Sequence, residues 1–166
     1  GLSRKIETST LHVERAAFVP SSRGGVIVRA RERPGDPYRL WLFEGDGSKP
    51  RDLGLDVFPS WAISPDGRYV AAKTAVDTIS VVAVAGGPRR DVQVTDVNIG
   101  VSRWSTDGRS LFLNLALRWP CEIHRLDLAT GKIELWKRVA PPDSTGIVQC
   151  ASIVPSADGR SYAYTV

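Results

Sequence analysis

A short turn motif recurs at regular intervals along this chain. Its three clear copies are Ser64–Val70, Ser105–Leu111 and Ser156–Tyr162, each with Asp-Gly-Arg at its centre. A degraded fourth copy occupies Ser21–Ile27, so the marker glycines stand at positions 24, 67, 108 and 159, with spacings of 43, 41 and 51 residues. A period of this length indicates a repeat architecture, in which each unit buries an apolar face against the next one.

Each unit reads as four short strands joined in an antiparallel meander. In the second unit the Asp-Gly turn joins the first two strands, and Gly86-Gly87 with Pro88 joins the last two. Both turns use residues that suit hairpin geometry, and the segments between them are rich in β-branched residues. We therefore predict an all-β chain, with units at about 11–54, 55–97 and 98–140 and an incomplete unit at 147–166.

The large residues near the markers keep the two-residue period of a strand. Four of them are predicted to pack between neighbouring sheets, namely Phe18, Trp61, Trp104 and Ile153. Trp41 and Trp136 are interpreted as half-buried sheet residues. Trp119, beside Pro120, is interpreted as an exposed loop contact.

The two best motif copies carry a resemblance to a known family. Trp61-Ala62-Ile63-Ser64-Pro65-Asp66-Gly67 and Trp104-Ser105-Thr106-Asp107-Gly108-Arg109 resemble the WD40-like PD40 repeats of bacterial TolB-type β-propellers. The resemblance covers most of the chain, although the first copy carries Arg23 in place of the aspartate. It implies an all-β β-propeller segment of about 3.5 four-stranded antiparallel blades. Similar repeats form sensor domains of some bacterial receptor-like Ser/Thr kinases and the propellers of prolyl oligopeptidase-type peptidases.

Composition is ordinary for a soluble globular domain. The chain has 166 residues, 42% of them hydrophobic, and a net charge of +4 that is spread along its length. A nucleic-acid site would need a basic patch with exposed aromatics, which the pattern lacks, and no apolar run approaches the roughly 20 residues of a membrane span. We expect neither nucleic acid binding nor membrane contact by this segment.

The chain contains no methionine, so we expect it to be a processed or excised part of a longer protein. An open stack of blades would leave unpaired strand edges and exposed sheet faces. We therefore expect further sequence, or self-association with a second copy, to complete the propeller.

Catalytic and metal-binding signals are weak. Cys121 and Cys150 have no metal-ligand spacing, and two buried free thiols are favoured over a disulfide, which stays open. His12 and His124 are interpreted as strand histidines rather than catalytic bases, because neither has an identifiable nucleophile beside it. The G-x-S-x-G, HExxH and P-loop patterns are absent. We predict no metal, no cofactor and no catalysis by this chain alone.

Variation in spacing indicates where a binding site could lie. It is absorbed by the loops between second and third strands and by the connections between units, which emerge on one face of a meander. Binding residues often lie on such loops, and arginine and aromatic side chains anchor interfaces. The candidates are Arg31, Arg33, Tyr38, Arg118 and Trp119. The alternative is that these loops merely tolerate insertion and lie free in solvent.

The repeated turn residues are interpreted as structural, because their placement is the same in each unit. They are Asp66, Gly67, Asp107, Gly108, Asp158 and Gly159.

The predicted function is non-catalytic binding of a protein or peptide, as a scaffold or sensor domain of a larger bacterial protein. The alternative is the substrate-gating propeller of a prolyl oligopeptidase-like hydrolase that lacks its catalytic domain, and a propeller that binds a small ligand is a third interpretation. The family resemblance implies an extracytoplasmic or periplasmic setting.

Overall fold

The computed structural model describes residues 8, 11–20, 25–96, 98–115, 119–140, 143, 145–147 and 152–165. Within these residues the chain forms β-strands and no helix, so the all-β prediction is confirmed. Accordingly, no helix in the described part of the chain has the length and apolar character to cross a membrane.

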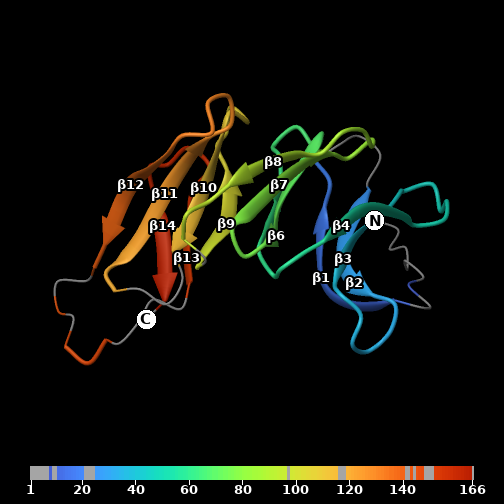
Figure 1. Ribbon diagram of the computed structural model, residues 1–166, viewed down its shortest axis with the longest axis horizontal. Coiled ribbons are helices and arrows are strands. Elements are labelled where there is room, and N and C mark those ends of the chain that lie inside the picture. Colours follow the sequence, from blue (N-terminus) through green and yellow to red (C-terminus); the bar gives the residue numbers. More distant parts are fainter. Residues whose placement is uncertain are drawn as a thin grey trace, which may run out of the picture.

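Three four-stranded sheets follow one another along the chain, each antiparallel and with its strands in sequence order (Figure 1). The first sheet holds β1 (His12–Phe18), β2 (Val26–Arg31), β3 (Arg39–Phe43) and β4 (Arg51–Asp56). The second holds β5 (Trp61–Ile63), β6 (Tyr69–Ala75), β7 (Thr78–Ala83) and β8 (Arg90–Gln93). The third holds β9 (Ile99–Trp104), β10 (Ser110–Leu115), β11 (Cys121–Asp127) and β12 (Ile133–Val139), and a two-stranded sheet follows with β13 (Ser152–Pro155) and β14 (Tyr162–Thr165).

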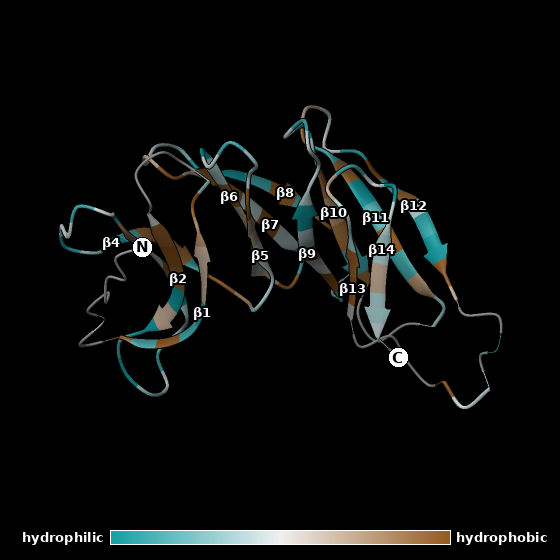
Figure 2. Ribbon diagram, turned by 180° about the vertical axis from the view of Figure 1, so that it is seen from behind, coloured by the Kyte–Doolittle hydropathy of each residue, from teal (hydrophilic) through white to brown (hydrophobic). Residues whose placement is uncertain are grey.

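The apolar core lies between neighbouring sheets. Trp61 joins residues of the first and second sheets in one cluster, and Trp104 joins residues of the second and third sheets in another. Ile153 of β13 packs with Phe112 and Ile123 of the third sheet. In Figure 2 the apolar colour accordingly runs along middle strands such as β2, which is buried along most of its length. The predicted inter-sheet positions of Trp61, Trp104 and Ile153 are confirmed.

The prediction for Phe18 is wrong, because this side chain is 80% exposed. Phe18 pairs with Val26 in the register of β1 and β2, and paired residues share a face of the sheet. Val26 belongs to a cluster within the first sheet, whereas the preceding residue, Ala17, packs in the cluster that meets the second sheet. Phe18 therefore lies on the face turned away from the second sheet, and no other sheet of the described chain covers it there.

Each Asp-Gly turn is held by the same small network, in which the preceding serine is central. The Ser64 hydroxyl donates to Asp66 Oδ1 at 2.6 Å and accepts the backbone N–H of Tyr69 at 2.9 Å. The same carboxylate oxygen accepts the backbone N–H of Arg68 at 3.0 Å. Ser105 with Asp107 and Ser156 with Asp158 repeat these bonds.

The glycines of these turns adopt the left-handed conformation, with φ of 71°, 67° and 70° at Gly67, Gly108 and Gly159. Glycine reaches this region without a Cβ penalty. In each turn the glycine N–H also donates to the carbonyl of the serine three residues before it. Residues 21–24 of the degraded copy lie outside the described residues.

The turn network lowers the pKa of Asp66, Asp107 and Asp158. In each case the largest cause is the hydrogen bond from the serine hydroxyl, followed by a backbone N–H bond. A carboxylate that accepts such bonds is stabilised in its charged form. These three aspartates are therefore ionised near neutral pH as part of the turns.

Two loop sets meet at one end of the sheets. The backbone N–H of Val57, between the first and second sheets, donates to the carbonyl of Tyr38 in the β2–β3 loop at 2.7 Å. Val94 makes the corresponding bond to Asp77 in the β6–β7 loop, also at 2.7 Å. At the other end, Val84 donates to the carbonyl of Arg68 beside the Asp-Gly turn. The loops that vary in length and the uniform turns thus lie at opposite ends.

Buried cations link the first and the second sheet to the start of the following unit, at the end that carries the variable loops. The Arg29 guanidinium donates to the Val57 carbonyl at 3.3 Å, and Lys73 Nζ donates to the Ile99 carbonyl at 2.8 Å. The two positions correspond, because each lies four residues after the strand residue that closes the preceding turn. Burial lowers the pKa of both groups.

Cys121 is fully buried and disulfide-bonded in this structure. The preference for a free thiol is therefore wrong for this residue, while Cys150 lies outside the described residues. The spacing of two cysteines does not show whether their chain segments approach in space. For this reason the sequence argument favoured free thiols over a disulfide.

We predict that Gly67→Ala destabilises the fold more than Gly108→Ala. Both substitutions place a Cβ at positive φ, which costs roughly 1–2 kcal/mol. At Gly67 that Cβ would also lie 2.8 Å from the Pro20 carbonyl oxygen, whereas at Gly108 it would meet no atom within 4 Å. The overpacking adds about 1–3 kcal/mol. If urea denaturation shows that both variants lose the same free energy of unfolding, the contact between the first and second sheets is loose at this point.

A second prediction concerns acid stability. Because the folded-state pKa of the three turn aspartates lies below its usual value, their contribution is present above the unfolded-state pKa and is lost as the pH falls through the folded-state pKa. The Ser64→Ala, Ser105→Ala and Ser156→Ala triple variant should raise these pKa values, measured by NMR titration of the carboxyl carbons. Its stability should therefore fall less on acidification below about pH 4 than that of the unmodified chain.

The matched control is Ser48→Ala, an exposed serine of the β3–β4 loop. It should leave the three aspartate pKa values unchanged. Unaltered aspartate pKa values in the triple variant would contradict the role assigned to the serine hydroxyls.

Candidate functional site

Two of the predicted binding residues come together at the first variable loop. The Tyr38 ring contacts two guanidinium groups, with the Arg29 Cζ 3.9 Å and the Arg31 Cζ 4.9 Å from its centroid. Stacking of this kind is attractive because the ring face is electron-rich. Arg33 is an exposed residue of the same loop, and its backbone N–H donates to Asp36 Oδ2 at 3.0 Å, which closes the loop.

The other predicted residues belong to the third sheet. Arg118 lies outside the described residues. Trp119 is half-buried and packs against the cluster that contains Cys121 and Ile123, so it is less exposed than a free loop contact would be. In the part of the chain that the structure describes, Trp119 shares no apolar cluster or ring contact with the group around Tyr38.

A hollow lies along the first strands of successive sheets. It has a volume of about 440 Å³ and is lined from β1, β5, β9 and β13, and we call it the inner hollow. β5 contacts β9, and β9 contacts β13, so these three strands form one continuous surface, and residues of β1 line the same hollow. Phe18 and Val154 are its exposed large apolar side chains, at 80% and 46%.

The inner hollow is rich in hydrogen-bond donors. Arg15 and Arg103 line it, and its described lining contains no carboxylate. The Arg15 guanidinium lies 5.1 Å from the Trp61 ring centroid, and Arg103 Nη1 donates to the Pro155 carbonyl at 3.2 Å. Trp61 Nε1 is buried and has no hydrogen-bond partner. This surface is therefore suited to a ligand that supplies acceptors together with apolar side chains.

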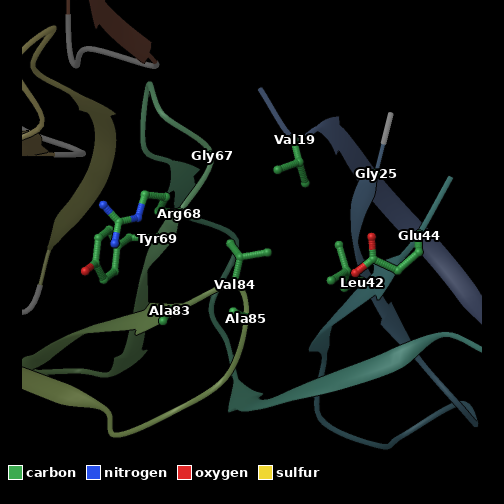
Figure 3. Close-up of a pocket in the computed structure, with 10 residues that line it drawn as sticks. All are labelled: Val19, Gly25, Leu42, Glu44, Gly67, Arg68, Tyr69, Ala83, Val84 and Ala85. Atoms are coloured by element: carbon green, nitrogen blue, oxygen red, sulfur yellow. The ribbon is translucent and has the colours of Figure 1, made fainter. Parts of the chain in front are cut away.

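A second hollow opens between the first and second sheets, on the side of the uniform turns (Figure 3). It has a volume of about 340 Å³, and Val19, Leu42 and Val84 form its apolar part. Figure 3 shows the Glu44 carboxylate directed toward this space, whereas Arg68 lies over Tyr69, 5.8 Å from the ring centroid. The hollow follows the seam between two sheets and brings no catalytic grouping together among its described residues.

The two histidines lie in strands, as predicted. His12 is exposed in β1, and His124 Nε2 lies 3.2 Å from Glu122 Oε2 in β11. A hydrogen bond from Arg138, and with a smaller effect one from His124, lowers the pKa of Glu122. Among the described residues, no group of three histidine, cysteine or acidic side chains is placed to hold a metal ion.

Sequence reasoning did not find the inner hollow, although one signal was available. Arg15 lies four residues before Val19 and Arg103 lies two residues before Ser105, and these are the residues that close the two turns. An even separation places both arginines on the same face of their strands. Each one accordingly reaches the following sheet, at Trp61 and at Pro155.

No family model matches the chain, and no curated protein matches it. Several solved structures are, however, similar to the chain. The chain is similar to TolB from Acinetobacter baumannii, with 16% identity and a TM-score of 0.66, over 93% of this chain and 37% of that one. It is also similar to a chain of the nidogen/laminin complex, with 13% identity and a TM-score of 0.67, over 96% of this chain and 58% of that one.

A third similar structure comes from work on two prolyl endopeptidases, with 18% identity and a TM-score of 0.59, over 92% of this chain and 26% of that one. The chain thus spans less than two thirds of each of these structures. At such identities the likeness concerns the fold. Together with the sheet topology, it shows a β-propeller segment of about 3.5 four-stranded antiparallel blades.

Proposed function

We propose that this chain is a non-catalytic β-propeller module that binds a protein or peptide at the inner hollow. The observation that carries the proposal is a surface that joins Arg15 and Arg103 with the exposed Phe18 and Val154 and has, in its described lining, no carboxylate. A partner segment with carboxylates or free carbonyls would pair with the two arginines, while its apolar side chains would cover Phe18 and Val154. Exposed apolar side chains grouped on one surface are typical of interaction sites.

The proposal includes the setting of the module. Disulfides persist in oxidising compartments, and Cys121 is disulfide-bonded. This supports an extracytoplasmic role, as part of a larger bacterial protein. The likeness of the turn motif to PD40 repeats supports the same setting.

The test uses short labelled peptides in which aspartate alternates with leucine or phenylalanine. We expect saturable binding by fluorescence anisotropy, weakening as salt rises because the arginines are partly screened. Arg15→Gln should weaken binding by about tenfold, because it removes a positive charge at the hollow. Val154→Ser should weaken it severalfold by removing apolar contact, and circular dichroism checks that both variants are folded.

The matched control is Arg33→Gln, which removes the same charge from an exposed loop residue outside the inner hollow. It should leave the affinity unchanged. Equal binding of peptides with lysine in place of aspartate, or full affinity in Arg15→Gln, would overturn the proposal.

A further inference from the structure

A pocket opens between the second and third sheets, beside the uniform turn that contains Gly108. Its volume is about 390 Å³, which is within the range of small-molecule sites, and we call it the seam pocket. Besides Gly108, its lining includes Tyr69, Val81, Ala83, Arg90, Trp104 and Leu128. Of these residues, Trp104 also lines the inner hollow, whereas the others do not.

Strand register places the lining residues of the second sheet on one face. Tyr69 pairs with Ala83 in the register of β6 and β7, and Val81 pairs with Arg90 in the register of β7 and β8. Paired residues share a face, and so do residues two apart in a strand, so these four side chains lie on the same side. Val81 packs against the cluster that contains Leu111 of the third sheet. The shared face is therefore the one turned toward the third sheet.

The glycine of each uniform turn reports how closely a neighbouring sheet packs against it. A Cβ at Gly67 would lie 2.8 Å from the Pro20 carbonyl oxygen, and one at Gly159 would lie 3.1 Å from Trp136 Cζ2. A Cβ at Gly108 would meet no atom within 4 Å. The three turns have nearly the same φ, so the difference comes from the neighbouring sheet. The seam between the second and third sheets is thus open at the turn that lines the pocket.

One positive charge in the lining has no carboxylate beside it. Tyr69 and Arg90 are both exposed, so a ligand can reach the hydroxyl and the guanidinium. Arg90 Nη2 donates to the Ala129 carbonyl at 3.5 Å, which is a long bond, and no carboxylate belongs to the described lining. The neighbouring Arg89, by contrast, lies 2.9 Å from Asp91 Oδ2. The seam pocket therefore joins apolar walls to a cation that a ligand could pair with.

We propose that the seam pocket binds a small organic acid with an apolar body. Its carboxylate would accept charge-assisted hydrogen bonds from the Arg90 guanidinium and a hydrogen bond from the Tyr69 hydroxyl. Its ring or alkyl chain would pack between Val81 and Leu128, in the space left open beside Gly108. A mostly apolar lining with a few polar groups that fix orientation is typical of small-molecule sites.

The experiment follows the backbone amide signals of Ala83 and Gly108 by NMR. The probes are 3-phenylpropionate and octanoate. The comparisons are 3-phenylpropionamide, which lacks the charge, and acetate, which lacks the apolar body. At least one of the two acids should shift both signals saturably, and the comparisons should bind at least tenfold more weakly. Equal binding of the neutral amide or of acetate, or no saturable shift with either acid, would overturn the proposal.

Variants test the contacts. Arg90→Gln removes the charge from an exposed residue and should weaken acid binding by about tenfold. Arg89→Gln is the matched control, because it makes the same change at the adjacent residue, which does not line the pocket. It should leave the affinity unchanged. Tyr69→Phe removes the hydroxyl alone and should weaken binding severalfold, and Ala83→Leu should prevent binding by filling the pocket. Equal affinities in Arg90→Gln and Arg89→Gln would contradict the proposal.

Arg15→Gln separates this proposal from the previous one. It should weaken peptide binding at the inner hollow and leave acid binding intact, because Arg15 does not line the seam pocket. Arg90→Gln should have the opposite effects. A loss of acid binding in Arg15→Gln, with full binding in Arg90→Gln, would place the acid in the inner hollow and overturn the seam pocket as its site.

Discussion

Burial between neighbouring sheets is the constraint on which the structure depends. Trp61 is buried because the first sheet covers it, and Trp104 because the second sheet does; Trp104 Nε1 donates to the Ala62 carbonyl of that sheet at 3.0 Å. A four-stranded meander cannot bury both its faces alone. The buried Arg29 and Lys73 reinforce the same seams by reaching carbonyls at the start of the following unit.

The sequence predicted the features that repeat and missed those that depend on tertiary contacts. The Asp-Gly motif identified the strands and turns because its chemistry is local, and Trp61 and Trp104 were placed correctly because a neighbouring sheet covers each of them. Phe18 failed because strand parity assigns a face but cannot show whether another sheet lies against it. The serine of each turn was overlooked, although its hydroxyl makes two bonds in every described copy.

At the candidate site, too, local features could be predicted from the sequence and tertiary ones could not. Arg31 and Tyr38 are close in sequence, so loop reasoning could find them, but their joint stack with Arg29 requires the strand geometry. The inner hollow draws one strand from each sheet, so its lining residues are scattered along the chain. Lys73 and Arg29 occupy matching strand positions, yet their different side chains conceal the match in sequence.

The pairing of polar groups distinguishes the seams between sheets from the inner hollow. Along the seams a neighbouring sheet supplies acceptors, as Ala62 does for Trp104. In the inner hollow, by contrast, Arg15 and Arg103 belong to a described lining that contains no carboxylate. A partner that supplies a carboxylate to these arginines would add charge-assisted hydrogen bonds at this surface. The repeat therefore builds the frame, and binding is expected where the charges of its lining residues are not balanced within the lining.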